Sequence, residues 1–140
     1  MNGVAFFVPG VPAPQGSKRL VRTKAGQTIM LDANSANLKE WRRAVTLTAK
    51  QHPGSWVKGQ PLSVSLDFTM PATLKDRAGW CAVRPDLDKL VRAVFDGLTD
   101  AGAIVDDSQV AVLTASKQRG IHCGVQVLIV ALSALLEETQ

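Results

Sequence analysis

Residues 85–98 read Pro85-Asp86-Leu87-Asp88-Lys89-Leu90-Val91-Arg92-Ala93-Val94-Phe95-Asp96-Gly97-Leu98. Apolar side chains recur through this stretch at the i, i+3, i+4, i+7, i+8, i+11 spacing of one helix face, from Leu87 to Leu98. Asp86, directly after Pro85, is suited to an N-cap, and Gly102 is suited to ending the helix. The stretch therefore predicts an amphipathic helix whose apolar face packs on a sheet.

The remaining patterns predict the partners of this helix. Alternating apolar and polar residues from Leu62 to Phe68 predict a half-buried strand. A second helix is expected from Asn34 or Ser35 to about Lys50, with Trp41 on its buried side. Further strands are expected at 4–8, 109–117 and 124–131, with a hairpin at 20–22 and 28–31, a turn near 119–120 and an irregular loop at 71–84. We expect a single α+β domain over residues 1–140, with a mixed sheet packed by two main helices.

The composition is that of a globular protein with a basic balance. The chain has 140 residues, of which 46% are hydrophobic and 20% charged, with a net charge of +4. The sequence pI of about 9.4 favours a polyanionic partner such as DNA. The 2 Cys form no CxxC motif, and the longest apolar run, residues 125–136, is too short to cross a bilayer. We expect a cytoplasmic protein with reduced thiols and without a membrane partner or an organic cofactor.

Two pairs of aspartates flank the predicted helix. Asp86 and Asp88 lie at its start, and Asp106 and Asp107 follow its end. Carboxylate oxygens are the ligands that Mg²⁺ and Mn²⁺ prefer, and such an ion suits phosphodiester hydrolysis. We expect the loop after Gly102 to bring the second pair back beside the first.

A simpler interpretation of these aspartates needs no metal. Asp86 is then only a helix cap, and Asp88 is a first-turn residue that the helix dipole favours. Asp106 and Asp107 are then an ordinary polar turn. Spacing alone leaves both interpretations open.

The acidic pattern nevertheless resembles one known family. The stretch Pro85 to Leu98, followed by Gly102 and by Asp106-Asp107-Ser108-Gln109-Val110, resembles the RusA family of Holliday-junction resolvases, which occur in phages and prophages. Further similarity covers most of the chain: Val8-Pro9-Gly10-Val11-Pro12, Gly16-Ser17-Lys18-Arg19, the Trp41-Arg42 helix, the strand at 62–68 and Gly124-Val125-Gln126-Val127.

The resemblance implies a small homodimer that binds four-way DNA junctions and cuts paired strands with Mg²⁺ or Mn²⁺. Three catalytic, metal-binding aspartates of the family fall on Asp86, Asp88 and Asp107 here. Asp106 is then a further or supporting ligand. The implied function is a metal-dependent, structure-selective endonuclease of DNA recombination and repair.

Two residues depart from the family pattern. Lys89 stands where the family often has Asn, and Arg92 stands where the family has a catalytically important Lys. Arg keeps the positive charge but does not readily give up a proton. Arg92 can therefore bind a phosphate, whereas Lys89 is the candidate if a proton must reach the leaving group.

The other basic residues are candidates for the DNA backbone. We expect contacts to phosphates from Lys18, Arg19, Arg84, Lys117 and Arg119. Solvated surface charge is the alternative for each of them. Two other functions stay open: a nuclease for flaps, forks or packaging intermediates, and a junction-binding protein without turnover, which the Lys89 and Arg92 departures favour.

Overall fold

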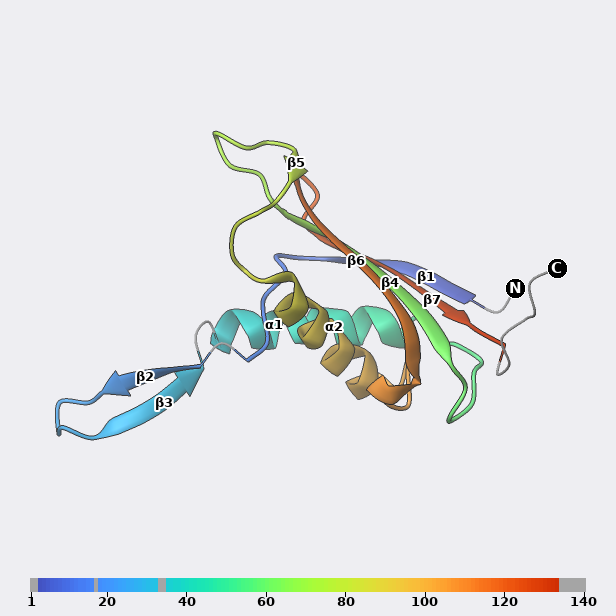
Figure 1. Cartoon of the computed structure of the whole chain (residues 1–140), viewed down its shortest axis with the longest axis horizontal. Helices are drawn as coiled ribbons and strands as arrows, with labels where there is room; N and C mark the ends of the chain where they lie inside the picture. Colours follow the sequence, from blue (N-terminus) through green and yellow to red (C-terminus); the bar gives the residue numbers. More distant parts are fainter. Residues whose placement is uncertain (1–2, 17, 33–34, 134–140) are drawn as a thin grey trace.

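The chain folds around one mixed sheet. The computed structural model describes residues 3–16, 18–32 and 35–133. The strands of this sheet are β1 (Gly3–Pro9), β4 (Leu62–Pro71), β5 (Gly79–Trp80), β6 (Val110–Gly120) and β7 (Gly124–Ala131). Their order is β1-β7-β4-β6-β5, with β4 and β6 parallel and the other neighbours antiparallel. The predicted α+β class is confirmed (Figure 1).

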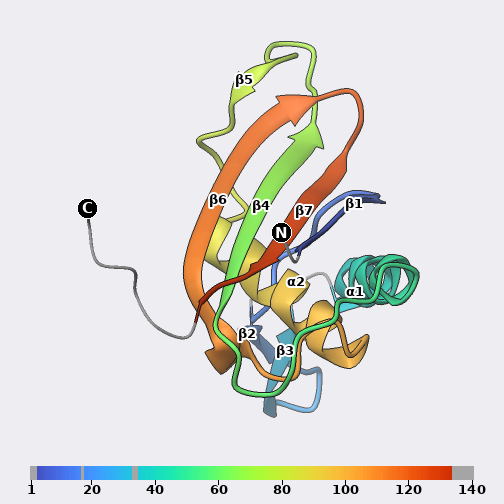
Figure 2. The same ribbon diagram turned by 90° about the vertical axis from the view of Figure 1, so that its right-hand side faces the viewer.

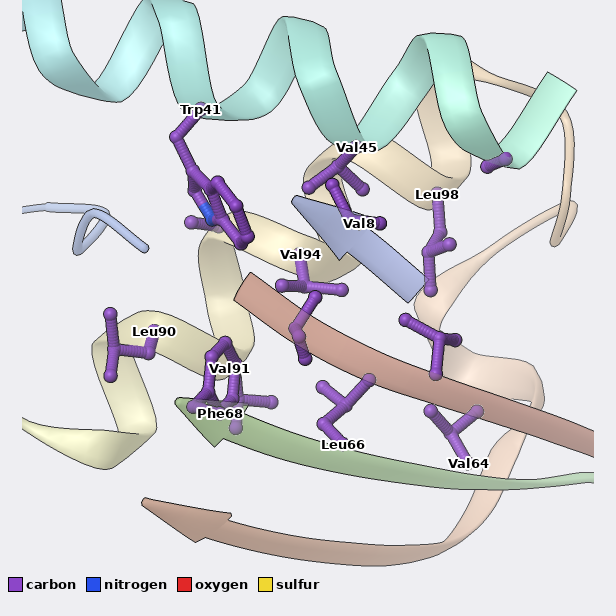
Figure 3. Close-up of a cluster of buried hydrophobic side chains, with 14 of the residues drawn as sticks. Val8, Trp41, Val45, Val64, Leu66, Phe68, Leu90, Val91, Val94 and Leu98 are labelled. Atoms are coloured by element: carbon purple, nitrogen blue, oxygen red, sulfur yellow. The ribbon is translucent and has the colours of Figure 1, made fainter. Parts of the chain in front are cut away.

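Two helices cover one face of the sheet. They are α1 (Ser35–Lys50) and α2 (Leu87–Asp100), as the apolar spacing predicts. Alternate residues of β4 are buried beneath them, and Leu62, Val64, Leu66 and Phe68 have no exposed surface. Figure 3 shows the side chains of α2 between α1 and the sheet, with Trp41 above Val94 and Leu98 near Val45. The prediction that Trp41 belongs to the core is confirmed, because only 2% of it is exposed.

The two helices cross at Gly97. A Cβ added at this position would lie 2.7 Å from Val45 Cγ1 and 2.9 Å from Val45 Cβ, closer than real contacts allow. Glycine is therefore required here by the close approach of α1, although it lowers the helix propensity of α2. This contact holds α2 at a fixed depth over the sheet.

A hairpin stands apart from the sheet. Among the described residues, strands β2 (Lys18–Arg22) and β3 (Thr28–Asp32) pair only with each other, and they extend away from the helices (Figure 1). The hairpin agrees with the prediction, and its strands are slightly longer than expected. Asn34, one of the two predicted caps of α1, lies outside the described residues, and Ser35 is already helical.

Three smaller expectations need correction. The loop at 71–84 contains the short strand β5, which pairs with Gln118 and Arg119. The turn after β6 falls at 121–123 rather than at 119–120, because pairing with β4 continues to Gly120. Asp86 has the extended backbone of a cap residue, but its side chain makes no capping hydrogen bond. Over the described residues, neither helix is long and apolar enough to cross a membrane.

Candidate active site

The first aspartate pair lies at the start of α2. Asp86 and Asp88 are both exposed. The backbone of Asp86 accepts hydrogen bonds from Lys89 N and Leu90 N, at 3.2 and 3.1 Å, and so begins the helix. Its carboxylate is not used by the cap, so the interpretation of Asp86 as a side-chain cap does not hold. Both carboxylates remain available to a ligand.

Lys117 holds the chain segment that leads into this aspartate pair. Its Nζ donates to the carbonyl oxygens of Val83 and Pro85, at 2.5 and 2.6 Å. The amide of Cys81 also donates to Lys117 O, at 3.0 Å. Lys117 thus fastens the segment before Asp86 to β6. It was predicted to bind phosphate, but its ammonium is engaged with backbone carbonyls.

The second pair lies at the other end of α2. A 3₁₀ helix at Asp107–Gln109 follows the α2 C-terminus and leads into β6. Thr99 Oγ1, in the last turn of α2, lies 3.0 Å from Asp107 Oδ1. About 16 Å of helix axis therefore separates Asp88 from the turn that holds Asp107. The expectation that the loop returns Asp106 and Asp107 beside Asp86 and Asp88 of the same chain is wrong.

Gln109 is the reason for this placement. It is 5% exposed, and its Oε1 accepts from Val105 N and Asp106 N, at 2.8 and 3.3 Å. Its Nε2 donates to Val57 O and Gln60 O, at 3.0 and 3.1 Å. A buried amide with all of these partners ties the aspartate turn to the loop before β4. Neither Gln109 nor Thr99 was among the predicted site residues; the polar Gln109 beside the apolar β6 is a local signal in the sequence that could have indicated the first of them.

Asp106 and Asp107 have different environments. The Asp106 carboxylate accepts from Ser108 N, at 3.2 Å, and from the Ser108 hydroxyl. These hydrogen bonds from Ser108 lower the pKa of Asp106, because they favour the ionised form. Both side chains are exposed, but Asp106 caps the 3₁₀ helix, whereas Asp107 contacts the Thr99 hydroxyl.

Asp96 belongs to the same end of α2. Burial raises its pKa, and the nearby Asp107 and Asp100 raise it further, while Arg42 and Arg92 partly oppose the shift. Asp96 is half-buried, in the field of Arg42 and Asp107.

A cleft opens beside the start of α2. Its volume is about 1110 Å³, and Arg84, Asp86, Lys89 and Arg119 line it together with the proline-rich segment after β1. Gln15 N donates to Lys89 O at 3.0 Å, which holds that segment on the first turn of α2. The positive charges beside Asp86 suit a phosphate-bearing ligand.

The basic side chains predicted to bind DNA differ in their exposure and in how far protein partners hold them. Arg84 and Arg92 are exposed, and Lys89 is half-buried at the cleft. Arg119 Nη1 donates to Pro71 O at 3.0 Å, and Arg119 Nε lies 4.0 Å from Asp76 Oδ2. Lys18 and Arg19 contribute backbone to β2, and their side chains lie outside the described residues. Among the described residues near Asp86 and Asp88, the basic side chains freest to bind a ligand are therefore those of Arg84, Lys89 and Arg92.

The acidic residues do not form a metal site within one chain. Among the described residues, no three His, Cys, Asp or Glu side chains are grouped closely enough to hold a metal ion. Asp86 and Asp88 supply two carboxylates at one end of α2, and Asp107 supplies a third at the other. These carboxylates supply the hard oxygens that Mg²⁺ and Mn²⁺ require, but they are divided between the two ends of α2.

Comparison with known families agrees with the resemblance. The family model described as endodeoxyribonuclease RusA matches residues 9–130, a range that includes both helices and all of the aspartates discussed above. Curated proteins give no match to the chain. Because the match covers most of its length, the chain belongs to the RusA family of Holliday-junction-resolving endonucleases.

Proposed function

We propose, from this family membership and the exposed aspartates, that the protein is a metal-dependent resolvase of four-way DNA junctions. It acts as a homodimer that cuts two strands of the junction, in DNA recombination and repair in the cytoplasm. Asp86, Asp88 and Asp107 are its metal-binding residues, with Mg²⁺ or Mn²⁺ as the ion. The observation that carries the proposal is the availability of all three carboxylates, on a chain that the family model matches from residue 9 to 130.

The donor chemistry fits the ion. All three aspartates are exposed, Asp86 has no capping role for its side chain, and Asp107 is oriented by Thr99. A divalent cation bound by these carboxylates would supply Lewis-acid activation of the phosphodiester and neutralise developing charge. The Thr99 hydroxyl, whose one proton is shared between Phe95 O and Asp107 Oδ1, helps to orient the Asp107 carboxylate, and Lys117 keeps the segment before Asp86 in place.

Because the three carboxylates lie at opposite ends of α2, each proposed metal site must be built from two copies of the chain. A helix axis of about 16 Å between Asp88 and Thr99 is far beyond the 2.0–2.6 Å of metal–oxygen bonds. Asp86 and Asp88 of one copy therefore combine with Asp107 of the other. A two-fold symmetric dimer would contain two such sites, one for each cut strand.

The nearby cations have the roles of phosphate ligands. Lys89, half-buried at the cleft, and the exposed Arg92 bind the scissile or neighbouring phosphate. Lys89 is the residue proposed to donate a proton to the leaving oxygen, because the guanidinium of an arginine does not readily give up a proton. Arg84 binds the DNA backbone, which provides affinity without sequence information. Lys18 and Arg19 of the hairpin are further candidates for backbone contacts.

Cleavage of synthetic DNA tests this proposal. Wild-type protein in Mg²⁺ should make paired, symmetric nicks in a mobile four-way junction. Asp88→Asn should bind the same junction and leave it uncut. Faster cleavage of flap or Y-shaped DNA would favour a nuclease for other branched substrates. Tight junction binding without cleavage in Mg²⁺ or Mn²⁺ would favour a binding protein.

A further inference from the structure

The cleft beside the start of α2 is larger and more apolar than a phosphate alone requires. Its volume is about 1110 Å³. Pockets that hold small organic ligands have volumes of roughly 300–1,000 Å³, so this cleft has room for a group of that kind. A surface that contacts only the phosphate backbone is lined mainly by basic side chains. Most of the residues that line this cleft are instead apolar, and they include Pro12, Ala13, Pro14, Trp41, Met70 and Cys81.

Hydrogen bonds hold the walls of the cleft in place. The segment after β1 is bound at its start, where Gly10 N donates to Cys123 O at 3.1 Å. It is bound again where Gln15 N donates to Lys89 O at 3.0 Å. At the end of β4, the Arg119 guanidinium donates to the carbonyl of the last strand residue at 3.0 Å. The cleft is therefore formed by the fold itself, which lowers the cost of ordering it around a ligand.

Trp41 contributes an unused hydrogen-bond donor to the wall of the cleft. Its side chain is 2% exposed, and among the described residues its Nε1 has no hydrogen-bond partner. A buried N–H without a partner is unfavourable, and native structures seldom contain one. Asn37 and Glu40, also on α1, add an exposed amide and an exposed carboxylate to the lining. Apolar walls with a few polar groups are typical of a pocket for an organic ligand.

The same cleft contains the groups proposed to hold the phosphodiester. Arg84, Asp86 and Lys89 all line it. A nucleobase is joined to the phosphate backbone through one sugar. A phosphodiester held at Asp86 and Lys89 therefore brings a neighbouring base within reach of the apolar wall. In continuous duplex that base stays stacked and paired, and it enters a protein pocket only if it leaves the stack.

We propose that this cleft binds one unstacked nucleobase of the DNA strand whose phosphodiester lies at Asp86. The apolar wall covers the faces of the base, and Trp41 Nε1 and the Asn37 amide supply donors for its edge. Unstacking is least costly where a base is already unpaired, as beside a branch point. The pocket therefore favours branched DNA over continuous duplex. This inference rests on the proposed function, because it assigns a subsite beside the proposed site of cleavage.

A base of the bound strand is the occupant that the charges favour. Arg84, Lys89 and Arg119 line the cleft, and their positive charges attract a polyanion. A base that is joined to bound phosphates acts with them as one linked ligand, which a free nucleotide does not. Stabilisation of the protein against heat by free nucleotides as strongly as by a junction would assign the cleft to free nucleotides instead.

Junctions that lack one base locate the proposed contact. The measurements use Asp88→Asn protein, which is expected to leave the junction uncut. An abasic site beside the scissile phosphate should weaken binding by roughly tenfold, whereas abasic sites elsewhere should have no effect. A fluorescent adenine analogue at the sensitive position should brighten when the protein binds, because the base leaves the stack. This measurement needs no change in the cleft itself.

Ala44→Phe, in the same Asp88→Asn background, tests the cleft directly. Ala44 is half-buried and lines the cleft, so the added ring should occupy the place of the base. Binding to the complete junction should weaken by roughly tenfold, and an abasic site should then cause no further loss. The matched control is Ala5→Phe, which adds the same ring to β1 on the face of the sheet that the helices leave uncovered (Figure 2). It should bind as the parent does, and circular dichroism should show that both variants fold.

The outcomes separate this subsite from the proposed function. Equal affinity for the complete junction and for every abasic junction would overturn the subsite. Losses from Ala44→Phe and from the abasic site that add together would also overturn it. Wild-type protein that depends on the base for binding but cuts no branched DNA would overturn the proposed function and leave the subsite intact. Nicking of four-way junctions without any dependence on a base would do the reverse.

Discussion

Thr99 Oγ1 lies 3.0 Å from Asp107 Oδ1 and 2.9 Å from Phe95 O, so one hydroxyl connects the last turn of α2 to an aspartate of the candidate site. This contact places Asp107 at the end of α2 opposite Asp86 and Asp88. It is the local reason that the proposed site would need two copies of the chain.

Removal of the Thr99 hydroxyl should lower cleavage without unfolding the protein. Thr99→Val keeps the shape of the side chain but leaves Asp107 without its orienting partner. Residues that orient a metal ligand typically contribute 10- to 100-fold, so we expect a loss of roughly tenfold in the rate of junction cleavage. Thr99→Ser should restore most of the rate. A Thr99→Val enzyme with unchanged cleavage and metal affinity would show that Asp107 needs no orientation by Thr99.

Lys117 and Arg84 should differ in their contribution to DNA binding. Lys117 is engaged with the carbonyls of Val83 and Pro85, whereas Arg84 is exposed at the cleft. Each phosphate contact contributes about 0.9 to the slope of log affinity against log salt concentration. Arg84→Met should reduce that slope by about one such unit. Lys117→Met should leave the slope unchanged and lower the cleavage rate instead; the reverse pattern would return Lys117 to the phosphate-binding residues.

Gly97→Ala should destabilise the fold although alanine favours helices. The added Cβ would lie 2.7 Å from Val45 Cγ1, and overpacking of this kind costs about 1–3 kcal/mol in the free energy of unfolding. Chemical denaturation measures the loss. The double variant Gly97→Ala with Val45→Ala should cost less than the sum of the single changes, because the two sites contact each other. Additive costs would place the clash elsewhere.

Asp96→Asn should stabilise the protein near neutral pH. Burial and the neighbouring Asp107 and Asp100 raise the pKa of Asp96 in the folded state, so the folded chain binds this proton more tightly than the unfolded chain. The ionised carboxylate therefore costs stability above the folded pKa, and its removal should raise the melting temperature slightly, because solvent screens a carboxyl that is only partly buried. The gain should disappear as the pH falls below the unfolded value of 3.8. A gain that persists at low pH would have another cause.

Periodic burial explains why the main elements were predictable. The apolar stripe of α2 and the alternation of β4 are local consequences of packing on one core, and both elements appear where these patterns predict them. The family could be recognised from the sequence because the aspartate motif lies in one short stretch of the chain.

The arrangement of the site depends on contacts that leave no periodic signal. Gln109 fastens the Asp107 turn to Val57 and Gln60, which are distant in sequence, and so directs the turn away from Asp86. Lys117 was predicted to contact the DNA backbone, with solvated surface charge as the alternative, but its partners are carbonyls that only the folded chain brings near it. A loop that follows a helix can stay at the C-terminal end of that helix or fold back to its N-terminal end. Spacing in the sequence does not decide between these two positions.

Complementation between two inactive variants tests most directly whether each metal site is shared by two copies. Asp88→Asn and Asp107→Asn chains, co-expressed with different affinity tags and purified as a heterodimer, would share one intact set: Asp86 and Asp88 of the second chain with Asp107 of the first. We predict that this heterodimer nicks one strand of a four-way junction at about half of the wild-type rate, whereas each homodimeric variant is inactive. A heterodimer as inactive as its parents would contradict a shared site and place the three carboxylates within one chain.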